Sequence, residues 1–83
     1  MMILVDVVFP ELDKTIDFYL DDQARGWDIA EEIATMAART CGRQYVPGAD
    51  VVMLYSVDMQ SRLNLNWSLS KNGIHSGARL LLI

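Results

Sequence analysis

The fold is decided by the stretch Leu69-Ser-Lys-Asn-Gly-Ile-His-Ser-Gly-Ala-Arg-Leu-Leu-Leu-Ile83, which closes the 83-residue sequence. Gly73 and Gly77 indicate turns, because glycine adopts left-handed backbone conformations without steric cost. The apolar run that follows predicts a final strand over residues 78–83. Alternation along this strand places Leu80 and Leu82 inward.

Two strands open the sequence. Residues 2–9 form an apolar run rich in Ile and Val, interrupted by Asp6 and followed by Pro10, which cannot donate to a strand ladder. Residues 14–21 alternate between apolar and polar side chains, as a half-buried strand does. The short turn predicted at residues 10–13 makes the two strands a hairpin.

A single helix is predicted over residues 27–41. Its apolar stripe has helical spacing and consists of Ile29, Ile33, Met36, Ala37 and Thr40. Asp28 and Glu31 have the spacing of a capping box, so we expect Asp28 to accept from the first backbone amides. Gly42 follows the last position of the stripe and suits the left-handed residue that ends a helix.

The remaining elements are shorter. A loop over residues 44–50 precedes a third strand over residues 51–57, which is apolar on both faces apart from Ser56. The pattern fits either parity, and of the two we expect the one with Val52 and Leu54 pointing inward. A turn over residues 58–61, a short strand over residues 62–65 and a loop or single helical turn over residues 66–73 follow. This element order predicts an α+β fold of the β-grasp type, with a mixed sheet of four to five strands packed on one helix. Residues 1–83 are too few for two cores and form one domain.

Composition excludes several classes of partner. The net charge is −4 and the basic residues are scattered, which argues against duplex nucleic acid and anionic lipid. The single cysteine excludes an internal disulfide and fits a reducing compartment. A basic leader and an apolar run of about 20 residues are both missing, so we expect neither a signal peptide nor membrane insertion. We expect a cytoplasmic protein, either free or peripheral to a membrane complex.

No residue pattern indicates an enzyme or a cofactor. His75 lies in a glycine-flanked turn with no second His or Cys at metal spacing, so we expect a solvated side chain. Cys41 lies at the predicted helix end, where the dipole does not activate a thiol. Trp27 and Trp67 lie beside element boundaries and are expected to pack in the core or at its edge. The alternative for each tryptophan is an exposed anchor for a partner.

The outer face of the sheet is the candidate interaction surface. If Asp6 points outward, strand alternation turns a set of apolar side chains to the same side, where polar residues normally dominate. The predicted interaction residues are Leu4, Val8, Met53, Tyr55, Leu81 and Ile83. An apolar patch of this kind on a small domain is typical of a site for another protein or for a second copy of the chain.

The chain resembles the ubiquitin superfamily over essentially its whole length. The spacing of apolar residues in its second half matches that family's pattern, at Leu63, Leu69, Ile74, Leu80 and Leu82. The ending, from Leu69 through the glycine corner to Arg79, resembles the bacterial YukD/EsaB group, which accompanies type VII secretion systems of Gram-positive bacteria. The chain differs from that group in the loop over residues 58–66.

The resemblance implies a non-enzymatic adaptor of a secretion system, which binds protein partners, including membrane-embedded components, through the outer sheet face. Two alternatives remain. The first is a self-associating β-grasp module or the cytosolic head of a membrane protein. The second is a covalent carrier, which is disfavoured because Leu82 and Ile83 stand where a carrier of this superfamily has a flexible Gly-Gly tail.

Overall fold

The first two strands form where alternation and Pro10 predict them. In the computed structural model, which describes residues 1–40, 42 and 53–82, β1 spans Met2–Phe9 and β2 spans Lys14–Asp21. They pair antiparallel from Met2 opposite Asp21 to Phe9 opposite Lys14. The link is a 3₁₀ turn over Pro10–Leu12, closed by Asp13 at φ 51°. Aspartate tolerates this left-handed conformation because its short polar side chain makes local hydrogen bonds.

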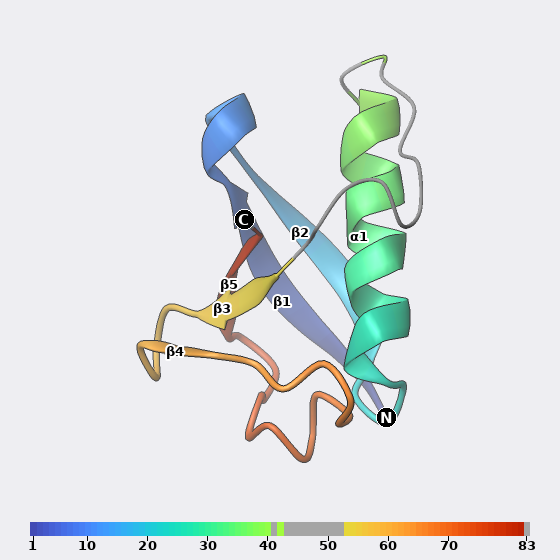
Figure 1. Ribbon diagram of the computed structural model, residues 1–83, viewed down its shortest axis with the longest axis vertical. Coiled ribbons are helices and arrows are strands. Elements are labelled where there is room, and N and C mark those ends of the chain that lie inside the picture. Colours follow the sequence, from blue (N-terminus) through green and yellow to red (C-terminus); the bar gives the residue numbers. More distant parts are fainter. Residues whose placement is uncertain (41, 43–52, 83) are drawn as a thin grey trace.

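The other elements complete a five-stranded mixed sheet and one helix. They are α1 (Gly26–Thr40), β3 (Leu54–Ser56), β4 (Ser61–Arg62) and β5 (Arg79–Leu82). The strand order is β2-β1-β5-β3-β4, with β1 and β5 parallel and the other pairs antiparallel. The helix crosses one face of this sheet (Figure 1). The predicted β-grasp fold is therefore confirmed, with β1, β5 and β3 adjacent.

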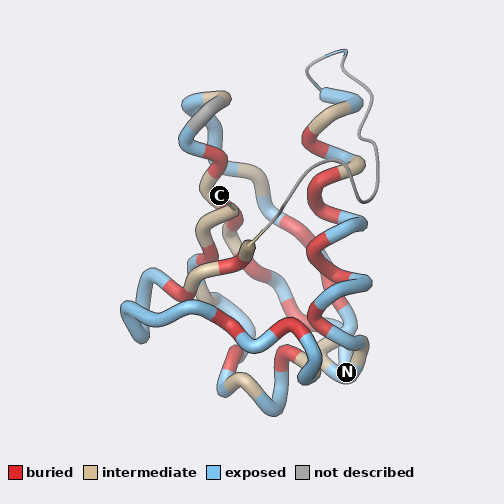
Figure 2. The backbone as a smooth tube through the Cα atoms, viewed as in Figure 1, coloured by how far each residue is buried: buried red, intermediate tan, exposed pale blue. Residues whose placement is uncertain are grey.

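The core lies between the helix and the sheet, where buried positions of both face each other (Figure 2). Its fully enclosed side chains come from all parts of the chain and include Val5, Val7, Ile33, Leu54, Leu69 and Leu80. Phe9 packs edge-on against Phe18, with ring centroids 6.2 Å apart. Leu82 is half-buried against this core, as its inward position predicts.

The helix buries a stripe that matches the predicted one in part. Ile29, Ile33 and Ala37 are buried as expected, but Met36 is 45% exposed and Thr40 is also exposed. The buried stripe is instead completed by Ala30 and Ala34. The expectation for Met36 and Thr40 was wrong because the helix turns its alanine side to the sheet, where small side chains allow close approach.

The helix begins at Gly26 and is capped by backbone carbonyls. The Gly26 amide donates to the Trp67 carbonyl at 2.8 Å and the Trp27 amide donates to the Leu65 carbonyl at 2.9 Å. The predicted capping box is wrong, because Asp28 lies inside the first turn with its carboxylate 3.6 Å from the Arg25 guanidinium. At the other end Gly42 has φ 71° and donates to the Arg39 carbonyl, as predicted for a helix stop.

The segment after β4 is held by side chains and turns. β4 is shorter than the predicted strand, yet Leu63 and Leu65 beyond it are buried. Asn72 donates to the Asn64 and Ser68 carbonyls at 3.0 and 2.8 Å and accepts from the Asn64 amide. Residues 66–73 form turns and no helix. Gly77, at φ 90°, then leads the chain into β5 as predicted.

The contact between the helix start and the 65–67 segment gives a first prediction. A Cβ added at Gly26 would lie 2.8 Å from the Leu65 Cα and 3.0 Å from its carbonyl oxygen. Because these are backbone atoms, Gly26→Ala should cost about 1–3 kcal/mol of unfolding free energy despite the better helix propensity of alanine. Urea denaturation measures the difference. A variant more stable than wild type would contradict the close packing.

Candidate interaction surface

The face of the sheet opposite the helix carries alternating rows of side chains. Along β1, Leu4, Asp6 and Val8 point away from the core, while the residues between them are buried. Leu4 is 41% exposed, and Asp6 and Val8 are partly exposed. Pairing with β2 extends all three positions across the sheet, and pairing with β5 extends Asp6 and Val8 on the other side as well.

One row is apolar and crosses three strands. Val8 pairs with Leu81 of β5, and Leu81 pairs with Tyr55 of β3. All three side chains are partly exposed. The three residues are direct cross-strand neighbours on one face of the sheet, so their side chains stand side by side. We call Val8, Leu81 and Tyr55 the outer apolar row.

A charged row lies beside the apolar one. Asp6 pairs with Asp17 of β2 on one side and with Arg79 of β5 on the other. The Arg79 guanidinium is 3.9 Å from the Asp6 carboxylate. The pKa of Asp17 is raised, chiefly because its protonated form makes a hydrogen bond to Asp6 and also because the two carboxylates repel each other.

The charged row divides the predicted patch. Leu4 lies on its far side, where it pairs with Tyr19 of β2. Tyr19 is 68% exposed and belongs to the surface, although it was not among the predicted interaction residues. Its outward position follows from alternation along β2, and the hairpin register places it beside Leu4. The outer face thus has an apolar pair and an apolar row, with Asp6 between them.

Of the remaining predicted residues, Met53 stands two positions before Tyr55 in the sequence. Met53 precedes β3, is partly exposed, and its sulfur accepts from the Arg62 guanidinium at 3.2 Å. Leu54 is fully buried, which confirms the inward parity chosen for this strand. Val52 and Ile83 lie outside the described residues.

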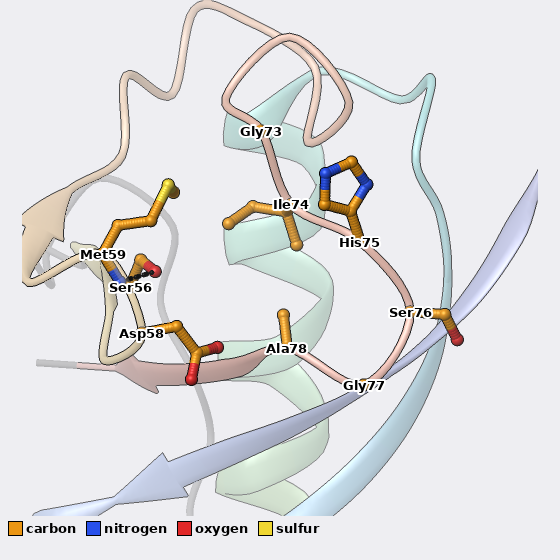
Figure 3. Close-up of a pocket in the computed structure, with 9 residues that line it drawn as sticks. All are labelled: Ser56, Asp58, Met59, Gly73, Ile74, His75, Ser76, Gly77 and Ala78. Atoms are coloured by element: carbon orange, nitrogen blue, oxygen red, sulfur yellow. Dashed lines mark hydrogen bonds between the residues drawn. The ribbon is translucent and has the colours of Figure 1, made fainter.

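A shallow hollow of about 370 Å³ lies where β3 and the turn before β5 meet (Figure 3). It is lined by Ser56, Asp58, Met59 and residues 73–78. Its polar groups hold the backbone: Ser56 Oγ accepts from the Met59 amide, and Asp58 Oδ2 accepts from the Arg79 amide at 2.9 Å. His75 is exposed at the hollow, as expected for a turn residue.

The described residues contain no group of three or more His, Cys, Asp or Glu placed to hold a metal ion.

The two tryptophans flank the helix start and are not core residues. Trp27 is 42% and Trp67 is 43% exposed. The Trp27 indole donates to Asn66 Oδ1 at 3.1 Å, and the Lys71 ammonium lies 4.8 Å from the centroid of the Trp67 ring. Both therefore pack at the edge of the domain. Cys41 lies outside the described residues.

The repulsion between Asp6 and Asp17 gives a second prediction. Because the folded-state pKa of Asp17 lies above its unfolded-state value, the native state holds the proton more tightly. The charged form thus lowers stability at neutral pH, and this loss is relieved as the pH falls through the folded-state pKa. Asp17→Asn should raise the urea midpoint at pH 7, and the gain should shrink towards pH 3.8, the ordinary pKa of aspartate.

Asp13→Asn is the matched control, because Asp13 is exposed in the link between β1 and β2 and has no strand partner. It removes the same charge away from Asp6. A gain that is equal for the two variants, or independent of pH for Asp17→Asn, would contradict the proximity of the two carboxylates.

No protein-family model and no curated protein matches the sequence. Solved structures do match. The chain is similar to the EccD5 ubiquitin-like domain from Mycobacterium xenopi, at 24% identity and a TM-score of 0.73, covering 100% of this chain and 93% of that one. It is also similar to the ubiquitin-like domain of the Mycobacterium tuberculosis type VII secretion system protein EccD1, at 13% identity and a TM-score of 0.75, covering 100% and 98%.

A larger assembly contains the same fold. A chain of an ESX-5 inner membrane complex matches at 21% identity and a TM-score of 0.71, covering 99% of this chain and 20% of that one. Here, no helix formed by the described residues has the length and apolar character needed to cross a membrane. At these identities the likeness establishes the fold, which is a ubiquitin-like β-grasp.

Proposed function

We propose that this ubiquitin-like domain is a non-enzymatic adaptor of a type VII secretion system, of the YukD/EsaB kind. Its outer sheet face binds a protein component of the membrane complex. The observation that carries the proposal is the outer apolar row, in which Val8, Leu81 and Tyr55 are directly paired on a face that the helix does not cover.

The energetics of an open sheet face support this role. A sheet covered on one side normally turns polar side chains to water on the other. Here the three side chains of the outer apolar row lie together, and Leu4 with Tyr19 adds a second apolar pair. Covering these side chains removes apolar area from water at about 25 cal/mol per Å², so the face gains from association with another protein.

The comparisons support the choice of system. EccD5 and EccD1 carry ubiquitin-like domains, EccD1 is a type VII secretion system protein, and a chain of the ESX-5 inner membrane complex contains this fold. The sequence ending from Leu69 to Arg79 resembles the YukD/EsaB group. A small domain that shares the fold of such components, with an uncovered apolar row, fits a role in protein contacts of that machinery.

Apart from His75, the polar side chains at and near the hollow that would be candidates for chemistry have structural partners. Ser56 and Asp58 each hold a backbone amide, and Asn72 holds the loop before Gly73. His75 lies exposed at the hollow beside Ser56 and Asp58. These contacts support binding, rather than catalysis, as the role of the domain.

The experiment is an affinity capture from detergent-solubilised cells that express the protein naturally. Wild type is compared with Leu81→Glu and with Leu81→Lys, which place either charge at the centre of the outer apolar row. Both variants should lose the captured membrane secretion components by tenfold or more, since a buried unpaired charge is costly. Substituting both a negative and a positive side chain distinguishes the two kinds of contact. An apolar contact is lost with either charge, whereas an electrostatic contact depends on the sign of the charge.

Met36→Glu is the matched control, because Met36 is 45% exposed on the helix and lies off the sheet. It should retain the components, and circular dichroism should show that all variants are folded. Equal capture by wild type and both Leu81 variants would exclude the outer apolar row. Light scattering that shows concentration-dependent dimers, lost in the Leu81 variants, would instead favour a self-associating module.

A further inference from the structure

The charged row decides what can cover the outer face. Leu4 and Val8 lie on the same side of β1 with Asp6 between them, and Asp17 lies beside Asp6 on β2. An occupant that covers both apolar sites at once must therefore also cover the two carboxylates. Removing a carboxylate from water without a partner is costly, so the occupant must bring a compensating positive charge.

The domain itself supplies only part of that charge. Among the described residues, Arg79 is the cation in ion-pair contact with this pair, and its guanidinium lies 3.9 Å from Asp6. Asp17 faces Asp6 from the other side of β1, away from Arg79, so this row contains two carboxylates and one guanidinium. The middle of the outer face thus keeps a net charge of about −1, which is complementary to one lysine or arginine.

A second copy of the chain does not meet this requirement. A two-fold contact presents the same surface patch from both copies. Centred on the charged row, it would bring together four carboxylates, Asp6 and Asp17 of both copies, with two Arg79 guanidinium groups. The excess of like charge across such an interface is unfavourable. The surface is therefore suited to a different protein that carries a basic side chain.

The spacing of the rows indicates the shape of the occupant. Neighbouring outward residues of β1 are two residues apart, or about 6.6 Å along the strand. An extended peptide gains its affinity at a free sheet edge, through main-chain hydrogen bonds that the face does not offer. A helix places residues i and i+4 on one side, about 6 Å apart along its axis, which matches the row spacing.

Resting on the proposed function for the choice of surface, we propose that the outer face binds an amphipathic helix of the partner protein. This helix carries a lysine or arginine four residues from an apolar side chain on each side. The basic group lies at Asp6 and Asp17. One flanking apolar residue packs on Leu4 and Tyr19, and the other packs on Val8 and Leu81.

The test uses a display library of helix-forming peptides that is randomised along one face. Peptides are selected on wild-type protein and kept if they fail to bind Leu81→Glu. We expect these peptides to share a lysine or arginine with apolar residues four positions before and after it. Their affinity should fall about tenfold or more for Asp17→Asn, because close charge pairs across an interface are strongly coupled.

Two further variants control the result. Asp13→Asn removes a charge outside the face and should leave the affinity unchanged. Asp17→Lys reverses the charge, so selection on it should enrich aspartate or glutamate at the same peptide position, which a loss of fold could not produce. Circular dichroism of each variant checks folding.

Three outcomes would overturn the inference. These are selected peptides without the basic residue, an affinity that Asp17→Asn does not change, and a selection that yields no peptide sensitive to Leu81→Glu. The first two would leave the outer apolar row as the binding surface, so the proposed function would stand. The capture from cells tests the proposed function independently of the peptides.

Discussion

The parallel pairing of β1 with β5 is the constraint on which the rest of the structure depends. Because the strand order is β2-β1-β5-β3-β4, β5 is the only strand in that order that joins the N-terminal hairpin to β3 and β4. Val7 and Leu80 are paired at its centre, and neither is exposed to solvent. Its start is fixed by the Gly77 amide, which donates to the Leu4 carbonyl at 2.7 Å, and by the Asp6 amide, which donates to the Ala78 carbonyl at 3.0 Å.

The pairing of β1 with β5 determines which side chains lie on each face of the sheet. A shift by one residue would move every side chain of β5 to the opposite face. With Leu80 opposite Val7 in the core, Leu81 must stand beside Val8 on the outside, and Arg79 must stand beside Asp6. The apolar and charged rows of the outer face are therefore a direct consequence of how the core is closed. Fold and proposed binding surface rest on the same hydrogen bonds.

Much of the fold could be predicted from the sequence, because strands and turns are indicated by residues that are close together in the chain. Alternation of apolar and polar residues, together with Pro10, predicted β1 and β2 with the bounds that the structure has. The helix cap could not be found in this way, because the Gly26 and Trp27 amides donate to carbonyls about 40 residues further along the chain. The spacing of Asp28 and Glu31 matched a local capping box that does not form. Met36 was misplaced because helical spacing alone does not show that the alanine side faces the sheet. The sequence alone did not predict that a charged row divides the outer face, because this depends on the strand register that places Asp17 opposite Asp6.

The most direct test of the central claim is NMR of methyl-labelled protein with a soluble paramagnetic co-solute, at low protein concentration. The methyl groups of Leu4, Val8 and Leu81 should be broadened strongly, and those of Val7 and Leu80 should be protected, as their burial requires. Protection of Leu81 together with broadening of Leu80 would show that β5 has the opposite register. The outer apolar row, and the binding role built on it, would then be wrong.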